Sequence, residues 1–308
     1  MFGSTGYNYE QFNRKSLLSD AVISKFGGAP KPGDKAPDFE GRTLEGDKVR
    51  LSDFRGEKNV VLTFGSATCP QSAGSIGGLN DLYEDYRDEN TEFLYVYVRE
   101  AHPGEDIPAH RSMNDKIAAA ERFRDEEDIA MSIVVDDLGG KIHRKYGSLP
   151  NPTFIVDRSG RVAFRSLATR PKTIAAALDE LLEVQEERGT DHAIVQGGEE
   201  TWMPSMYTMV NAYRALERGG RGSLDTFKRE MGMPGRMAVA GSRVAGPIAD
   251  HPAAAISTVA AVGGVIALGL WVGRELRKRR FTNPYEYRGS YGSSRRGGDY
   301  SDYEAVGI

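Results

Sequence analysis

Hydrophobic residues between positions 31 and 186 follow two alternating spacings. Short uninterrupted runs of β-branched and aromatic residues are typical of buried strands, whereas apolar residues three to four positions apart are typical of helices that cover a sheet. The uninterrupted runs predict strands at 48–54, 59–64, 92–100, 131–135, 153–156 and 162–165. The other pattern predicts helices at 75–90, 116–124, 138–148 and 173–182. This order predicts one α/β domain with a mixed central sheet flanked by helices.

Three polar segments flank this domain. Residues 1–30 are polar, with one amphipathic patch at 12–26 that predicts a helix and no apolar stretch typical of a secretory signal. Residues 187–250 contain a single helical pattern at 206–217 and many glycines, so we expect a loosely packed extension or linker. Residues 274–308 are rich in Gly, Ser, Tyr and Arg, without a period that could form a core, which predicts a disordered tail.

Residues 253–273 differ from all of these because they contain no charged side chain. As a helix this segment would be roughly 31 Å long, close to the hydrocarbon thickness of a bilayer. Trp271 and the basic cluster at 274–280 follow in the order typical of a transmembrane helix. We therefore expect a single-pass membrane protein, with a buried core helix as the alternative. The basic cluster alone would place the C-terminus in the cytoplasm, and the α/β domain would then lie on the other side of the membrane. We nevertheless expect the α/β domain in the cytoplasm, and the orientation stays open.

Composition narrows the kinds of site to consider. The net charge is −4, and no basic patch interleaved with aromatic residues precedes position 270, so we expect no nucleic-acid partner. The five histidines lack the spacing of metal ligands, and one cysteine excludes both an internal disulfide and a Cys-rich metal site. We therefore expect no metal, and the candidate chemistry lies at the single thiol.

That thiol, Cys69, lies between the predicted strand at 59–64 and the helix that follows. The carboxyl ends of strands in α/β sheets collect ligands, and a helix N-terminus stabilises a thiolate and lowers its pKa. Pro70 suits the first helical turn, where no partner exists for an N–H group. We expect the hydroxyl of Ser66 or Thr68 to hydrogen-bond the thiolate or to pass on its proton. The alternative is a small, buried and inert thiol.

A second polar segment is expected at the same edge of the sheet. Glu100 and His102 follow the predicted strand at 92–100, so they should emerge near Cys69. The imidazole could protonate a leaving group or pair with the thiolate, and the carboxylate could orient the imidazole. The alternative is a solvated loop that carries a histidine and a glutamate.

Together these motifs resemble the thioredoxin-fold superfamily, and the opening at 31–70 is similar to redoxin and peroxiredoxin-like domains. More narrowly, the sequence FGSAT before Cys69 and the sequence EAHP at 100–103 resemble the iodothyronine deiodinase family, over residues 31–183. In that family an FGSxT turn precedes the catalytic selenocysteine and EAHP follows about thirty residues later. The resemblance implies a thioredoxin-like fold, Cys69 as nucleophile in place of selenocysteine, and a proton-relay network formed by Ser66, Thr68, Glu100 and His102.

The superfamily also carries a cis-proline beside its active thiol. Pro152, directly before the predicted strand at 153–156, matches that place. An ordinary proline at the start of a strand is the alternative.

The sequence departs from the deiodinase pattern because Ala67 stands where that family has a second cysteine. Since the chain has no resolving thiol, an external one such as glutathione or thioredoxin would have to regenerate Cys69. We therefore expect a thiol-dependent oxidoreductase without a bound cofactor, acting on a small-molecule electrophile: an aryl halide, a peroxide or a disulfide. The alternative is an inactive, membrane-tethered binding or scaffold protein in which residues 187–308 carry the function. A homodimer is compatible with either.

Overall fold

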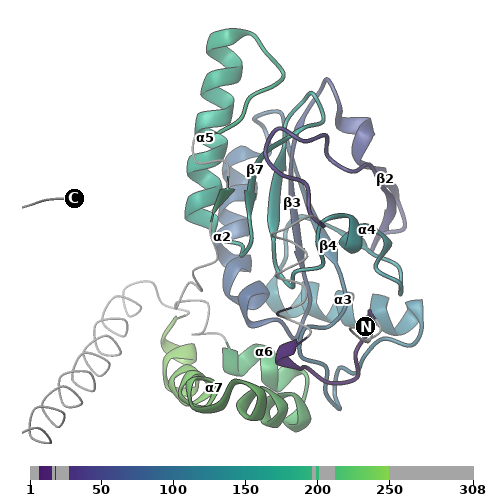
Figure 1. Ribbon diagram of the computed structural model, residues 1–308, viewed down its shortest axis with the longest axis vertical. Helices are drawn as coiled ribbons and strands as arrows, with labels where there is room; N and C mark the ends of the chain where they lie inside the picture. Colours follow the sequence, from purple (N-terminus) through teal and green to yellow (C-terminus); the bar gives the residue numbers. More distant parts are fainter. Residues whose placement is uncertain (1–6, 16–17, 19–27, 196–198, 201–211, 250–308) are drawn as a thin grey trace, which may run out of the picture. The chain divides into compact units, whose positions relative to one another are not determined.

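A computed structural model describes residues 7–15, 18, 28–195, 199–200 and 212–249 (Figure 1). The described strands form one sheet in the order β2-β1-β5-β4-β3-β6-β7-β8. They are β1 Glu40–Thr43, β2 Lys48–Arg50, β3 Asn59–Gly65, β4 Thr91–Tyr97, β5 Ser132–Val135, β6 Thr153–Val156, β7 Val162–Ser166 and β8 Glu199–Glu200. The helices are the 3-10 helix η1 Leu51–Phe54, α2 Pro70–Tyr86, α3 Met113–Glu127, α4 Lys141–Lys145, α5 Pro171–Arg188, α6 Ala212–Arg218 and α7 Arg221–Ala249.

The centre of the sheet combines parallel and antiparallel pairs. β3 runs parallel to β4, and β4 runs parallel to β5, whereas β6 pairs antiparallel with β3 on its other side. Gly65 lies opposite Tyr97, so the carboxyl ends of β3 and β4 meet at the same edge. This mixed sheet with flanking helices is a thioredoxin-like α/β fold, and it brings the segments that follow β3 and β4 together.

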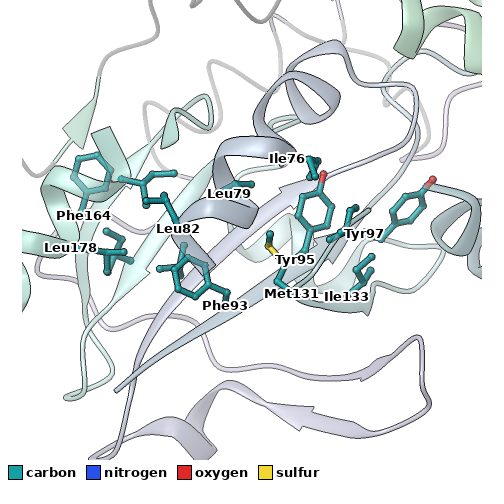
Figure 2. Close-up of a cluster of buried hydrophobic side chains, with 14 of the residues drawn as sticks. Ile76, Leu79, Leu82, Phe93, Tyr95, Tyr97, Met131, Ile133, Phe164 and Leu178 are labelled. Atoms are coloured by element: carbon teal, nitrogen blue, oxygen red, sulfur yellow. The ribbon is translucent and has the colours of Figure 1, made fainter. Parts of the chain in front are cut away.

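The core lies on both faces of the sheet, which explains the uninterrupted apolar run in β3. Val61 faces a cluster that includes side chains of α2, α3 and α5, among them Ile76, Leu79 and Leu178 (Figure 2). Leu62 faces the opposite cluster, which includes side chains of β6 and α4. Because neither face of β3 meets solvent, alternation of apolar and polar residues is absent from its sequence.

Several elements differ from those expected from the sequence pattern. The strand expected over 48–54 ends at Arg50, and the chain continues as η1. The strands β1 and β8 were not expected. Residues 187–250, expected to pack loosely, contain α6 and α7 in their described part, and Ala212, Ala215 and Leu216 are completely buried there. That expectation rested on the glycine content, which does not report burial against distant elements.

Three expectations fall mainly or wholly on residues that the structure does not describe. They are the transmembrane helix at 253–273, the tail at 274–308 and most of the helix at 12–26. Within the described ranges, no helix combines the length and the apolar character that a membrane crossing requires.

Candidate active site at the carboxyl ends of β3 and β4

Residues 66–69, here called the thiol turn, connect β3 to α2. Cys69 is the N-cap residue of α2, with an extended backbone (φ −87°, ψ 115°), and Pro70 occupies the first helical position. The Cys69 N–H donates to the Ser66 carbonyl at 3.2 Å and closes the turn. Gly65 precedes it because a Cβ at that position would overlap the Tyr95 hydroxyl oxygen. The expected placement of Cys69 between a buried strand and a helix N-terminus is confirmed.

A buried carboxylate holds the middle of the thiol turn. Oε2 of Glu100, a residue that is 2 % exposed, accepts from both the N–H (2.9 Å) and the Oγ1 (2.6 Å) of Thr68. Oε1 accepts from the Tyr97 hydroxyl and lies 3.2 Å from Nε2 of His110. Burial raises the pKa of Glu100, but its contacts with His110, Thr68 and Tyr97 outweigh this effect and leave the pKa lowered. Glu100 is therefore ionised at neutral pH.

The segment at 100–102 and the thiol turn are joined by two further hydrogen bonds. The Ser66 hydroxyl accepts from the Ala101 N–H at 3.1 Å, and Thr68 Oγ1 accepts from the His102 N–H at 3.0 Å. The structure thus brings four of the sequence-predicted site residues together. The hydroxyls of Ser66 and Thr68 form hydrogen bonds with residues 100–102. The hydroxyl that favours the Cys69 thiolate belongs instead to Ser72.

The His102 side chain lies in an apolar environment. Its ring centroid is 4.3 Å from that of Phe12 and 5.2 Å from that of Phe227. Burial lowers the pKa of His102 to about 3, against the smaller raising effect of Glu100, and its Nδ1 has no hydrogen-bond partner among the described residues. Burial between aromatic rings thus disfavours an ion pair between a His102 imidazolium and the thiolate, which is one of the two roles considered for this side chain.

The histidine that contacts Glu100 is instead His110, which the sequence analysis missed. His110 lies in the loop between β4 and α3, ten residues after Glu100, and no local motif marks it. Its detection requires the tertiary contact at 3.2 Å.

The Cys69 thiol is only 2 % exposed. Burial raises its pKa, whereas the Ser72 hydroxyl and the backbone amides of Ser72 and Gln71 act in the opposite direction, and the Glu100 charge raises the pKa further. The expected lowering of the thiol pKa is therefore wrong in this conformation, because desolvation outweighs the helix N-terminus. Ser72 was missed because the apolar spacing predicted the helix only from position 75, whereas α2 begins at Pro70.

The proline segment lies beside the thiol turn, but its expected cis bond is wrong. No peptide bond between described residues is cis. The Pro152 carbonyl accepts from the Phe64 N–H at 3.0 Å, so extended backbone continues the β3–β6 ladder through this residue. Asn151 reaches the site instead, because its side-chain amide donates to Ser72 Oγ at 3.3 Å. Over the described ranges, no three His, Cys, Asp or Glu side chains are grouped so that they could hold a metal ion.

Comparisons with known proteins cover the same part of the chain. Residues 32–165 match the AhpC/TSA family. Type I iodothyronine deiodinase from Xenopus laevis is 30 % identical over 142 residues, which are 43 % of this chain and 55 % of that protein. The thiol-disulfide oxidoreductase ResA from Bacillus cereus is 31 % identical over 131 residues, which are 42 % of this chain and 66 % of ResA.

Among solved structures, a thioredoxin-family thiol:disulfide interchange protein from Chlorobium tepidum TLS is 16 % identical, with a TM-score of 0.39 over 50 % of this chain and 97 % of that one. The sequence matches to the deiodinase and to ResA cover between about half and two thirds of the length of those two proteins. Residues 32–165 are thus similar to the AhpC/TSA family, and the strand arrangement of this part of the chain is that of a thioredoxin-like fold.

Proposed function

We propose that this protein is a thiol-dependent oxidoreductase that uses Cys69 as a nucleophile toward a soft electrophile and is regenerated by an external thiol. The observation that carries the proposal is the Glu100 carboxylate, which is buried and binds both donors of Thr68, the residue directly before Cys69. Two relatives named a deiodinase and a thiol-disulfide oxidoreductase support redox activity in general.

The reaction proceeds by nucleophilic substitution at an atom X, which is oxygen, sulfur or iodine. The Cys69 thiolate forms an S–X bond, and the bond from X to its former partner breaks. The leaving group departs with the electron pair and takes a proton. Where X is oxygen or iodine, one external thiol then displaces X as water or iodide and forms a mixed disulfide with Cys69; where X is sulfur, this mixed disulfide exists already. A further external thiol releases the Cys69 thiolate and leaves as a disulfide. Where X is oxygen or iodine, the two external thiols have then supplied both electrons. Where X is sulfur, that disulfide still contains half of the substrate, and a second external thiol releases it and completes the two-electron reduction.

The buried network supplies a proton site for this cycle. Glu100 Oε1 and His110 Nε2 lie 3.2 Å apart, so one proton can reside between them. Tyr97 remains a hydrogen-bond donor because burial and the Glu100 charge raise its pKa well above the ordinary value. In the proposed cycle the Ser72 hydroxyl stabilises the Cys69 thiolate, and the Glu100–His110 pair holds the proton that the leaving group takes.

One observation favours a second function. Cys69 is 2 % exposed and its pKa is raised, chiefly by burial, which is the environment of an inert structural thiol. In this alternative the protein is a binding or scaffold protein, and Cys69 only fills space in the core.

Turnover by the full chain distinguishes the two functions. Hydrogen peroxide, hydroxyethyl disulfide and an iodinated phenol represent the three classes of electrophile, with glutathione or dithiothreitol as reductant. We expect wild-type turnover with at least one class, its loss in Cys69→Ser and a reduced rate in Glu100→Gln. Glu92→Gln is the matched control, because Glu92 lies on β4, the strand that leads to Glu100, but is paired at the surface with Lys58. Absence of turnover with all three classes would favour the scaffold alternative, and equal turnover in Cys69→Ser would refute the role of Cys69 as nucleophile.

The proposal includes attachment to a membrane through residues 253–273. Carbonate extraction of membranes from cells that express the full chain tests this part separately. The protein should stay in the membrane pellet, and its release into the supernatant would contradict attachment.

A further inference from the structure

The helices α6 and α7, here called the α6–α7 cap, contact the loop that follows β4. The Ser223 hydroxyl donates to the His102 carbonyl at 2.7 Å, and the Gly222 N–H donates to the Glu105 carboxylate at 2.7 Å. Gly104 approaches the cap so closely that a Cβ there would overlap the Gly219 carbonyl oxygen. These contacts place the cap against the loop that carries His102.

One side chain of the cap reaches the thiol turn itself. Arg218, the last residue of α6, is 6 % exposed, and its Nη1 donates to the Ala67 carbonyl at 2.9 Å. The Ala67 N–H donates to the Tyr97 hydroxyl oxygen at 3.4 Å, so the residue is held through both its N–H and its carbonyl. Among the described hydrogen bonds of residues 66–69, this is the one whose partner lies beyond the AhpC/TSA match at 32–165.

The Arg218 guanidinium is itself held by α3. Its Nε lies 2.6 Å from Glu126, its Nη2 pairs with Glu127, and its Cζ lies 5.3 Å from the ring centroid of Phe123. A guanidinium presents five donors in a planar fork, so one side chain can bind two carboxylates and a carbonyl at once. Arg218 therefore joins α3, the cap and the thiol turn through a single buried group.

Arg214, one helical turn earlier, provides an internal comparison. It pairs with the same Glu127 at 2.9 Å, but its side chain is 45 % exposed. Its charge and its helix match those of Arg218, whereas its described contacts do not include the thiol turn. The two arginines separate an effect on the thiol from an effect of charge pairing on α6.

We propose that Arg218 is a positioning residue that holds the thiol turn closed over Cys69, so that release of the α6–α7 cap admits the electrophile to the sulfur. This inference rests on the proposed function, because access matters only if Cys69 reacts. Its physical basis is that Sγ must be reached for any substitution, and that Cys69 is 2 % exposed in the conformation in which Arg218 binds the Ala67 carbonyl.

The rate of alkylation of Cys69 by iodoacetamide tests this inference without turnover. Cys69 is the single cysteine of the chain, so the full-length protein reports on this thiol alone. Rates are measured from about pH 6 to pH 10 for wild type, Arg218→Ala, Arg218→Lys and Arg214→Ala, since the thiolate is the reacting species. The ionisable groups that act on the thiol, Glu100 and Tyr95, are unchanged in all four proteins.

We expect Arg218→Ala to react about tenfold faster than wild type near pH 7.5, with its midpoint about one pH unit lower, because one unit of thiol pKa changes the thiolate fraction about tenfold. Arg214→Ala should stay within about twofold of wild type, since it does not touch the turn. Arg218→Lys should fall between them, because an ammonium cannot hold the carbonyl and both carboxylates in a fork. Circular dichroism and a thermal melt confirm that each variant is folded.

Equal rates in Arg218→Ala and wild type, or equal acceleration in Arg214→Ala, would overturn the inference. If Arg218→Ala does not fold, Gly104→Ala takes its place, because a Cβ there displaces the Gly219 carbonyl and loosens the cap without removing a charge. A Gly104→Ala protein that is alkylated at the wild-type rate would likewise overturn it. An accelerated variant with no turnover in any protein would leave this inference standing and refute the proposed function.

Discussion

Replacement of Glu100 by alanine is expected to destabilise the fold more than replacement of any carboxylate at the surface. Four donors converge on its two oxygens: the N–H and hydroxyl of Thr68, the Tyr97 hydroxyl and the His110 ring. All of them are buried, so alanine leaves them without an acceptor and without room for bulk water. The free energy of unfolding should therefore fall by about 3–5 kcal/mol, the cost typical of breaking a buried charged pair by removal of one partner.

A graded series separates the charge from the shape of the side chain. Glu100→Gln keeps one carbonyl acceptor for Thr68 and an amide that can donate to the Tyr97 oxygen, so it should cost only about 1–2 kcal/mol. Glu92→Ala is the matched control on β4, the strand that leads to Glu100, where the carboxylate pairs with Lys58 and is partly exposed. Its loss should cost about 0–1 kcal/mol.

Urea denaturation followed by circular dichroism measures all three differences, and the slopes of the transitions show whether the folded states remain comparable. The pKa of Glu100 is lowered in the folded protein, so its stabilising effect is fully present above the ordinary carboxyl pKa of about 4.3 and is lost as pH falls below it. The difference between wild type and Glu100→Gln should thus narrow in acid. A cost for Glu100→Ala no larger than that for Glu92→Ala, or a difference from Gln that does not change with pH, would refute the buried-carboxylate network.

Three further predictions concern residues around the site. Gly65→Ala should cost about 1–3 kcal/mol in a thermal melt because its Cβ overlaps the Tyr95 hydroxyl oxygen, whereas Gly77→Ala, with open space around it, should be neutral or stabilising; similar losses would contradict this packing. Thr68→Val removes the hydroxyl that donates to the buried carboxylate and should cost about 1–2 kcal/mol in urea denaturation, with Thr68→Ser close to wild type; a neutral valine variant argues against that bond. Burial lowers the pKa of Lys116 to about 8, so above this pH the unfolded chain binds more protons than the folded one. The free energy of unfolding of wild type, relative to that of Lys116→Met, should therefore rise by roughly 3 kcal/mol toward pH 10. A difference that does not change with pH would show that Lys116 titrates normally.

Local sequence was sufficient to predict the scaffold of the site. The apolar run of β3, the small turn after it and Pro70 at the first helical position are each local signals, and they place Cys69 at the N-cap of α2. The segment at 100–102 could be placed near the turn because parallel strands end at the same edge, and the hydrogen bonds between Thr68 and Glu100 agree with that placement.

The protonation states and the partners of the site were decided by the tertiary structure. Spacing indicated that His102 lies near the thiol, but packing against Phe12 and Phe227 keeps it neutral, and His110 contacts the carboxylate instead. A helix N-terminus favours a thiolate, yet burial of Cys69 outweighs it. Desolvation depends on everything packed around a group, which the neighbouring sequence does not report.

The contribution of the α6–α7 cap shows the same division most clearly. Arg218 and Ala67 lie 151 positions apart and join through a buried guanidinium. Sequence patterns report the preferences of neighbouring residues, so they identified the strand, the turn and the thiol. Long-range burial is a property of the assembled fold. It determined which charged side chains pair, the raised pKa of the thiol and which distant residue contacts the thiol turn.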